Sequence, residues 1–186
     1  MRGQLDRILF AGPVGAGKTS AIAAVSDSPV SRTEAGASDE VRERKAQTTV
    51  AMDYGTLDID DRTTIQLIGA PGQERFSFMW DILAERAIGL VLLLDHARPD
   101  PLGDLEFYLK AFRSLMDRAG SGTVVGITRC DLSEAVDLEP YRLALQEEGL
   151  SLPVFEVDAR ERDDVKVALL ALVAELHPMV HRHHSR

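Results

Sequence analysis

The chain has 186 residues, enough for one globular domain with a substantial core. Its formal net charge of −9 at pH 7 argues against non-specific attraction to nucleic acid or anionic lipid, because such binding needs a basic surface. The only cysteine, Cys130, excludes an internal disulfide bond, and the longest apolar run, residues 88–94, is too short to cross a bilayer. We therefore expect a cytoplasmic protein with no nucleic-acid partner, no lipid anchor and no direct membrane insertion.

Short apolar runs alternate along the chain with segments of helical character, which predicts a mostly parallel sheet with helices on both faces. The first strand is expected at Ile8–Ala11 and the first helix at Lys18–Val25. The polar stretch Ser26–Gln47 is predicted to be a long loop, of the kind that is usually functional or disordered. Two strands follow, at Thr49–Ile59 and Thr63–Ile68. The short turn between them forces them to be antiparallel, since a parallel pair needs a long crossover.

The same alternation continues to the end of the chain. Further strands are expected at Gly89–Leu94, Thr123–Thr128 and Val154–Val157, and further helices at Phe78–Ala87, Leu102–Arg118, Pro140–Glu148 and Val165–Leu176. The fold class is therefore α/β, with three layers and one antiparallel hairpin strand. We expect a single domain over residues 1–180 and a disordered tail over residues 181–186.

One segment between the first strand and the first helix carries clear chemistry. Residues 12–19, GPVGAGKT, match the phosphate-binding loop pattern G-x-x-x-x-G-K-[ST], the P-loop, at every fixed position. The glycines bring backbone N–H groups against phosphate oxygens, Lys18 places a positive charge at the β- and γ-phosphates, and Thr19 offers a hydroxyl to Mg²⁺. The residues expected at the phosphates are Gly12, Val14, Gly15, Ala16, Gly17, Lys18, Thr19 and Ser20. The pattern indicates binding of a nucleoside triphosphate.

A second cluster, Gly72-Gln73-Glu74, follows the hairpin and resembles the second switch of Ras-like small GTPases. The form Ala-Pro-Gly-Gln and the run Thr49–Tyr54 most resemble the bacterial gliding-motility (MglA-type) and conservon GTPases. The resemblance implies that the Gly72 amide contacts the γ-phosphate and that Gln73 orients the attacking water, with Lys18 as the other catalytic residue. It also implies that Thr49 is a Mg²⁺ ligand together with Thr19. Thr48 is the competing assignment for the first-switch threonine.

A third motif concerns the base. Thr128-Arg129-Cys130-Asp131 resembles the guanine signature Asn-Lys-x-Asp, in which the carboxylate accepts hydrogen bonds from N1–H and the 2-amino group. The resemblance implies that the stem of Arg129 lies on the purine and that the Ala159 amide approaches O6, beside Arg160. The implied ligands are GTP or GDP with Mg²⁺. The alternative for Asp131 is an ordinary helix-capping or turn aspartate.

Two positions depart from the Ras-like pattern. Gly69 stands where an aspartate would hold a magnesium-bound water, and Val14 would crowd Gln73 inside the phosphate-binding loop. We therefore predict slow intrinsic GTP hydrolysis in a molecular switch. The resemblance implies a roadblock-type regulator or activating protein and effector proteins as its partners. One alternative is a nucleotide-binding scaffold that does not hydrolyse. The other is a P-loop ATPase or kinase that uses Asp95 at the magnesium site.

Overall fold

The computed structural model describes residues 6–35, 50–60, 63–133 and 135–176. Within these residues one seven-stranded sheet has the order β2-β3-β4-β1-β5-β6-β7. Only β3 runs against its neighbours, because it pairs antiparallel with both β2 and β4 whereas the remaining pairs are parallel. The strands are β1 Arg7–Ala11, β2 Ser31–Ala35, β3 Val50–Asp60, β4 Thr63–Gly69, β5 Ala87–Asp95, β6 Gly122–Thr128 and β7 Val154–Glu156.

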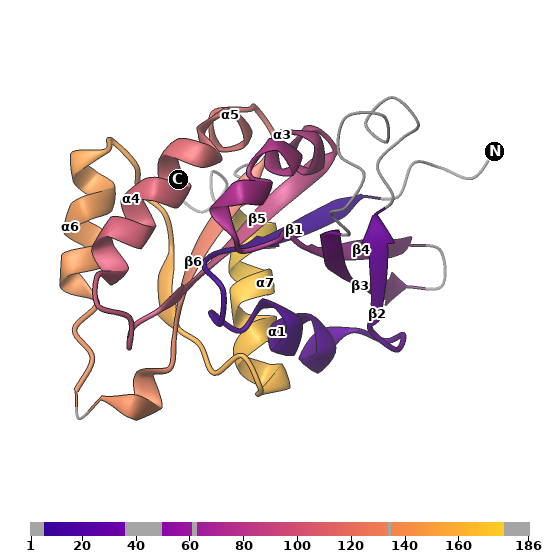
Figure 1. Cartoon of the computed structure of the whole chain (residues 1–186), viewed down its shortest axis with the longest axis horizontal. Coiled ribbons are helices and arrows are strands. Elements are labelled where there is room, and N and C mark those ends of the chain that lie inside the picture. Colours follow the sequence, from indigo (N-terminus) through magenta and orange to yellow (C-terminus); the bar gives the residue numbers. More distant parts are fainter. Residues whose placement is uncertain (1–5, 36–49, 61–62, 134, 177–186) are drawn as a thin grey trace, which may run out of the picture.

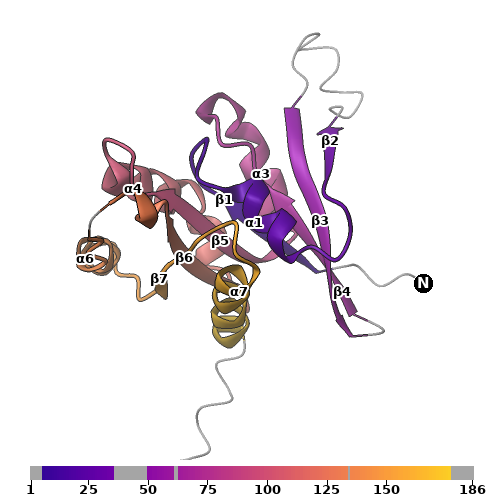
Figure 2. The same ribbon diagram turned by 90° about the horizontal axis from the view of Figure 1, so that it is seen from below.

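Helices cover both faces of this sheet. Helices α1 and α7 pack side by side on one face, and α3, α4, α5 and α6 cover the other (Figures 1 and 2). The helices are α1 Lys18–Val25, α3 Phe78–Glu85, α4 Pro101–Ala111, α5 Arg113–Met116, α6 Glu139–Glu147 and α7 Arg162–Leu176, with single 3₁₀ turns η1 Glu74–Phe76 and η2 Cys130–Leu132. The predicted three-layer α/β P-loop fold is confirmed.

The central strands are apolar throughout because both of their faces are covered. Along β5, Leu90, Leu92 and Leu94 pack toward α3, α4 and α5, while Val91 and Leu93 pack toward α1 and α7. All of these leucine and valine side chains are almost completely buried. Because β1, β5 and β6 are parallel, their carboxyl ends meet at one edge of the sheet, where α/β proteins usually bind ligands.

Two sequence predictions were wrong in detail. The expected loop Ser26–Gln47 contains the edge strand β2, which exists through backbone pairing with β3 and not through an apolar pattern of its own. The expected helix Leu102–Arg118 is divided into α4 and α5. The chain leaves helical geometry at Phe112 (φ −106°, ψ 15°), whose fully buried ring stacks on Trp80. Packing of this ring outweighs the helical periodicity of the sequence.

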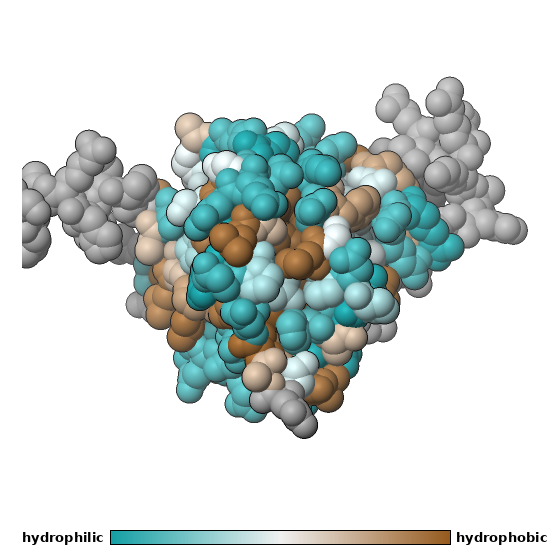
Figure 3. All heavy atoms as spheres, turned by 90° about the vertical axis from the view of Figure 1, so that its left-hand side faces the viewer, coloured by the Kyte–Doolittle hydropathy of each residue, from teal (hydrophilic) through white to brown (hydrophobic). Residues whose placement is uncertain are grey.

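Among the described helices, none has both the length and the apolar character that a membrane span requires. The surface on the side of α6 is largely hydrophilic, with separate hydrophobic patches (Figure 3). The expected tail at residues 181–186 lies outside the described residues.

Candidate functional site

The loop joining β1 to α1 has the backbone of a phosphate cradle. Gly12 and Gly17 adopt left-handed φ values of 136° and 95°. A Cβ atom at Gly12 would collide with the carbonyl oxygen of Leu93, and one at Gly17 would lie 2.7 Å from the Cβ of Ala159. Glycine is therefore required at both positions, for its backbone freedom and for its lack of a side chain. Helix α1 begins at Lys18, so the positive end of its dipole points into the loop.

Lys18 reaches back over this loop. Its Nζ donates hydrogen bonds to the carbonyl oxygens of Gly12 and Pro13, both at 2.7 Å. Burial lowers the pKa of Lys18 from 10.5 to about 8, and the nearby carboxylate of Asp53 offsets part of that fall. The loop thus holds a buried cation that a phosphate anion would stabilise.

An acidic residue that the sequence analysis did not select lies at the foot of α1. The Thr19 hydroxyl donates a short hydrogen bond to Oδ2 of Asp53, near the start of β3. Asp53 stands opposite Gly69 in the antiparallel pairing of β3 and β4. A Cβ atom at Gly69 would lie 3.2 Å from both the Cβ of Asp53 and the Cδ1 of Ile22, so the glycine leaves room for this carboxylate.

The donors at this point fit a magnesium ion. Hydroxyl and carboxylate oxygens are the ligands that Mg²⁺ prefers, and the ion usually also takes phosphate oxygens and waters. Thr19 and Asp53 would hold it beside the phosphate-binding loop. In the sequence, Asp53 could be recognised only as a carboxylate within a predicted strand. That it lies opposite Gly69 follows from the register of β3 and β4, which the sequence does not show.

Asp95, the alternative magnesium carboxylate, has other contacts. Its Oδ1 accepts a hydrogen bond from the Ala97 amide at 2.9 Å, and its Oδ2 lies 3.1 Å from Nε of Arg129. Arg129 also donates to the carbonyl oxygen of Gly15. Asp95 therefore fixes Arg129 against the phosphate-binding loop, and the carboxylate beside Thr19 is that of Asp53.

The segment after β4 closes against the phosphate-binding loop. A Cβ atom at Gly72 would lie 2.8 Å from Nζ of Lys18. The Trp80 indole donates a hydrogen bond of 2.9 Å to the Pro71 carbonyl, and the Tyr108 hydroxyl donates one of 3.2 Å to the Gly72 carbonyl. An aromatic cluster on α3 and α4 thus holds this segment in place.

Gln73 follows Gly72 and is exposed. It lines an open groove of about 380 Å³ together with Val14, whose side chain is 57% exposed, and with Tyr108. Val14 and Gln73 thus line the same groove, and the predicted crowding of Gln73 by Val14 stays a prediction. So does the slow hydrolysis expected from it.

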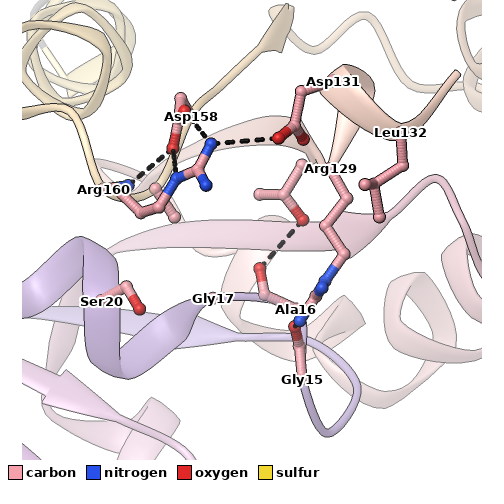
Figure 4. A pocket seen from close by; sticks show the side chains of 11 residues that line it. Gly15, Ala16, Gly17, Ser20, Arg129, Asp131, Leu132, Asp158 and Arg160 are labelled. Carbon is pink, nitrogen blue, oxygen red and sulfur yellow. Dashed lines mark hydrogen bonds and ion pairs between the residues drawn. The ribbon is translucent and has the colours of Figure 1, made fainter.

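A second cavity, of about 200 Å³, opens on the other side of the phosphate-binding loop (Figure 4). Its wall brings together segments far apart in the chain: the loop itself, the end of β6 with η2, and the loop after β7. The lining residues are Gly15, Ala16, Gly17, Ser20, Thr128, Arg129, Asp131, Leu132, Asp158, Ala159 and Arg160. The buried Thr128 hydroxyl ties β6 to the phosphate-binding loop through a 3.0 Å hydrogen bond to the Ala16 carbonyl.

Charged side chains meet at the rim of this cavity. Arg160 donates from Nε and Nη2 to the two carboxylate oxygens of Asp158, at 2.8 and 2.6 Å. Its Nη2 also lies 3.1 Å from Oδ2 of Asp131, in the opposite wall (Figure 4). Hydrogen bonds from Arg160 lower the pKa of Asp158 to about 2, and Asp158 raises the pKa of Arg160. The carboxylate expected to read the base is therefore already paired with a guanidinium.

The described site residues thus lie around one loop. The two cavities open on either side of it, with Gly72 and Gln73 on one side and Thr128, Arg129, Asp131, Ala159 and Arg160 on the other. Thr49 and its alternative Thr48 lie outside the described residues.

Residues 29–178 match the model of a family described as conserved hypothetical ATP binding protein. The chain belongs to this family. The match begins after the phosphate-binding loop, so it is independent of the motif at Gly12–Thr19. Among curated proteins, none matches the chain.

Membership of this ATP-binding family corrects the sequence interpretation. The resemblance to Ras-like small GTPases, and to the gliding-motility and conservon members in particular, was wrong, because the family model covering most of the chain is that of ATP-binding proteins. The features behind the resemblance were the phosphate-binding loop, the hairpin, the Ala-Pro-Gly-Gln form, the run Thr49–Tyr54 and the motif Thr128–Asp131. A phosphate-binding loop, a hairpin and short turns occur in more than one P-loop family, so they do not by themselves define one. At the level of the family, the protein is a P-loop nucleotide-binding protein.

Proposed function

We propose that this protein is a magnesium-dependent nucleoside triphosphatase that binds ATP and cleaves it to ADP and phosphate. The observation that carries the proposal is the arrangement at the N-terminus of α1. There a buried lysine ammonium, a threonine hydroxyl and an aspartate carboxylate meet at one glycine-rich loop. ATP is the proposed nucleotide because of the family description. GTP belongs in the same assay, because Asp131 is a carboxylate in the neighbouring cavity.

Each part of the loop has a separate task in this proposal. The backbone amides and Lys18 hold the β- and γ-phosphates and stabilise the negative charge that spreads over the transferring group. Thr19 and Asp53 would hold Mg²⁺, which when bound would neutralise negative charge on the phosphates. Gln73, in the open groove, orients the attacking water. A bond forms between the water oxygen and the γ-phosphorus, and the bond from that phosphorus to the bridging oxygen breaks, which leaves ADP. The released phosphate keeps one proton of the water, and the other passes to solvent.

The decisive experiment measures phosphate release by the full chain from ATP and from GTP, with and without Mg²⁺. We expect release that requires Mg²⁺. In Asp53→Asn the magnesium concentration for half-maximal activity should rise at least about tenfold, the lower end of what loss of a metal-supporting carboxylate costs. Asp58→Asn is the matched control, because Asp58 lies on the same strand but is exposed and bonds Thr64 away from the loop. Absence of nucleotide binding by folded wild-type protein would refute the proposal.

A second candidate function is transfer of the γ-phosphoryl group to a bound acceptor instead of water. The groove beside Gly72 favours it, because the groove opens next to Lys18 and combines polar walls with the rings of Phe107 and Tyr108. ADP formation that exceeds phosphate release once an acceptor is added would support transfer, because the γ-phosphoryl group then ends on the acceptor. Equal amounts of ADP and phosphate under all conditions would support hydrolysis.

A further inference from the structure

The pairing of Arg160 with Asp131 changes the chemistry of the cavity beside the phosphate-binding loop. Asp158 holds the guanidinium of Arg160 through two parallel hydrogen bonds, which fixes its plane and its position at the rim. Among the described residues, none accepts a hydrogen bond from Nη1 of Arg160. The guanidinium of Arg160, whose Nη1 donates to none of the described residues, therefore lies beside the acceptor oxygens of Asp131 at the rim (Figure 4).

The two purines differ in what they require from such a rim. A carboxylate alone is only an acceptor, so it matches N1–H and the 2-amino group of guanine. Adenine instead presents an acceptor, N1, next to a donor, its 6-amino group, and so needs a protein donor and a protein acceptor side by side. A guanidinium paired with a carboxylate supplies both.

The other cation in the cavity has different contacts. Arg129 donates to the Gly15 carbonyl and pairs with Asp95, so it is held toward the phosphate-binding loop. Of the four charged side chains that line the cavity, Arg129, Asp131, Asp158 and Arg160, only Arg160 brings donors next to Asp131. Asp158 holds Arg160 in that position.

We propose that Arg160 and Asp131 read the base as a pair, and that Arg160 is the specificity-determining residue that admits adenine to this cavity. The inference rests on the proposed nucleotide-binding function and names its base preference. Without Arg160, the Asp131 carboxylate would face the lone pair of adenine N1, while guanine would keep both of its donors to that carboxylate.

The test compares the affinities of the full chain for the non-hydrolysable imido analogues of ATP and GTP, by calorimetry with Mg²⁺. In Arg160→Ala the ATP analogue should bind at least about tenfold more weakly, whereas the GTP analogue should change less than about threefold. Arg160→Lys keeps a donor and should recover part of the ATP affinity. Arg162→Ala is the matched control, because Arg162 bonds Asp27 and the Ala24 carbonyl outside the cavity.

Asp131→Asn provides an independent arm. An amide carries both a donor and an acceptor and can bind adenine without Arg160. This variant should therefore retain affinity for the ATP analogue and lose affinity for the GTP analogue. A purely structural role of Arg160 would weaken both analogues equally, since they differ only in the base. An ATP-to-GTP affinity ratio unchanged in Arg160→Ala overturns the inference. If that variant does not fold, an unchanged ratio in Asp131→Asn overturns it instead. Folded wild-type protein that binds neither analogue would refute the proposed function as well.

Discussion

Replacing Lys18 by methionine should stabilise the nucleotide-free protein while removing nucleotide binding. Lys18 is 9% exposed, and burial lowers the pKa of its ammonium group from 10.5 to about 8. This fall means that the charged form costs the folded state about 3 kcal/mol at neutral pH. Methionine avoids that cost but gives up the hydrogen bonds to the Gly12 and Pro13 carbonyls, worth about 1 kcal/mol each. The variant should be more stable by about 1 kcal/mol, which raises the melting midpoint by about 2–4 °C.

The pH dependence gives a second measure of the same effect. The pKa of Lys18 is lower in the folded protein than in the unfolded chain. Between about pH 8 and about pH 10.5 the unfolded chain therefore holds a proton that the folded protein has released, so folding stability rises with pH in that window. Below about pH 8 the cost of burying the charge is fully present. Between about pH 7.5 and about pH 9.5 the free energy of unfolding of the wild type should thus rise by about 2 kcal/mol relative to that of Lys18→Met.

Urea unfolding of both proteins in the same buffers at several pH values measures this difference. Because the two proteins share all other titratable groups, the contributions of those groups cancel in the comparison. Lys110→Met is the control, because Lys110 is exposed on α4 and its replacement should give no such pH dependence. Thermal unfolding with and without ATP and Mg²⁺ then measures binding, since a ligand of the native state raises the midpoint. A stability difference between wild type and Lys18→Met that stays constant with pH would refute the reasoning, and so would a ligand-induced midpoint shift retained in the variant.

Three further substitutions probe two other parts of the site and one contact that supports the sheet. Gly69→Ala places a Cβ atom 3.2 Å from the Cβ of Asp53. The Mg²⁺ concentration required for nucleotide binding should therefore rise at least about fivefold in a Mg²⁺ titration, and an unchanged concentration would contradict this role of Gly69. Arg118→Met removes donors to three backbone carbonyls at the end of α3 and the start of β5 and should lower the free energy of unfolding in urea by about 2 kcal/mol; a loss below about 0.5 kcal/mol would argue against this. Trp80, the only tryptophan, donates a hydrogen bond to the Pro71 carbonyl, so its fluorescence should change when ATP and Mg²⁺ are added. An unchanged spectrum would show that the segment after β4 does not respond to the nucleotide. Trp80→Phe should abolish that signal and leave binding within about threefold, because the ring packing remains.

Much of the fold follows from local patterns in the sequence. Helix α1 has the predicted bounds, and β1 and β6 begin one residue earlier than predicted, because buried runs and the phosphate-binding loop mark their ends. Strand β2 was missed because an edge strand needs only backbone pairing. The break between α4 and α5 was missed because it depends on the packing of Phe112 against Trp80, which lies on another helix.

The candidate site, too, has a part that local sequence predicts and a part that it does not. The phosphate-binding loop was predictable because its chemistry lies in consecutive residues. The pair of Arg160 and Asp131 joins two loops that are distant in the chain, and no spacing rule connects them. The guanine interpretation placed Arg160 beside the Ala159 amide and did not connect it with the Asp131 carboxylate. A short motif therefore predicted residues that the structure gathers around one cavity, whereas a base bound there stays a proposal.

Gly69 and Asp53 are best understood as one structural unit. Opposite residues in an antiparallel pair have Cβ atoms only about 4.5–5.5 Å apart, so a side chain on one strand can occupy the space that a glycine leaves on the other. Here the carboxylate stands on β3 and the glycine on β4, and the Thr19 hydroxyl still has its acidic partner. The glycine at the end of β4 is therefore compatible with the magnesium site proposed at Thr19 and Asp53. The partner has to be sought across the sheet, at the position that the register places opposite the glycine.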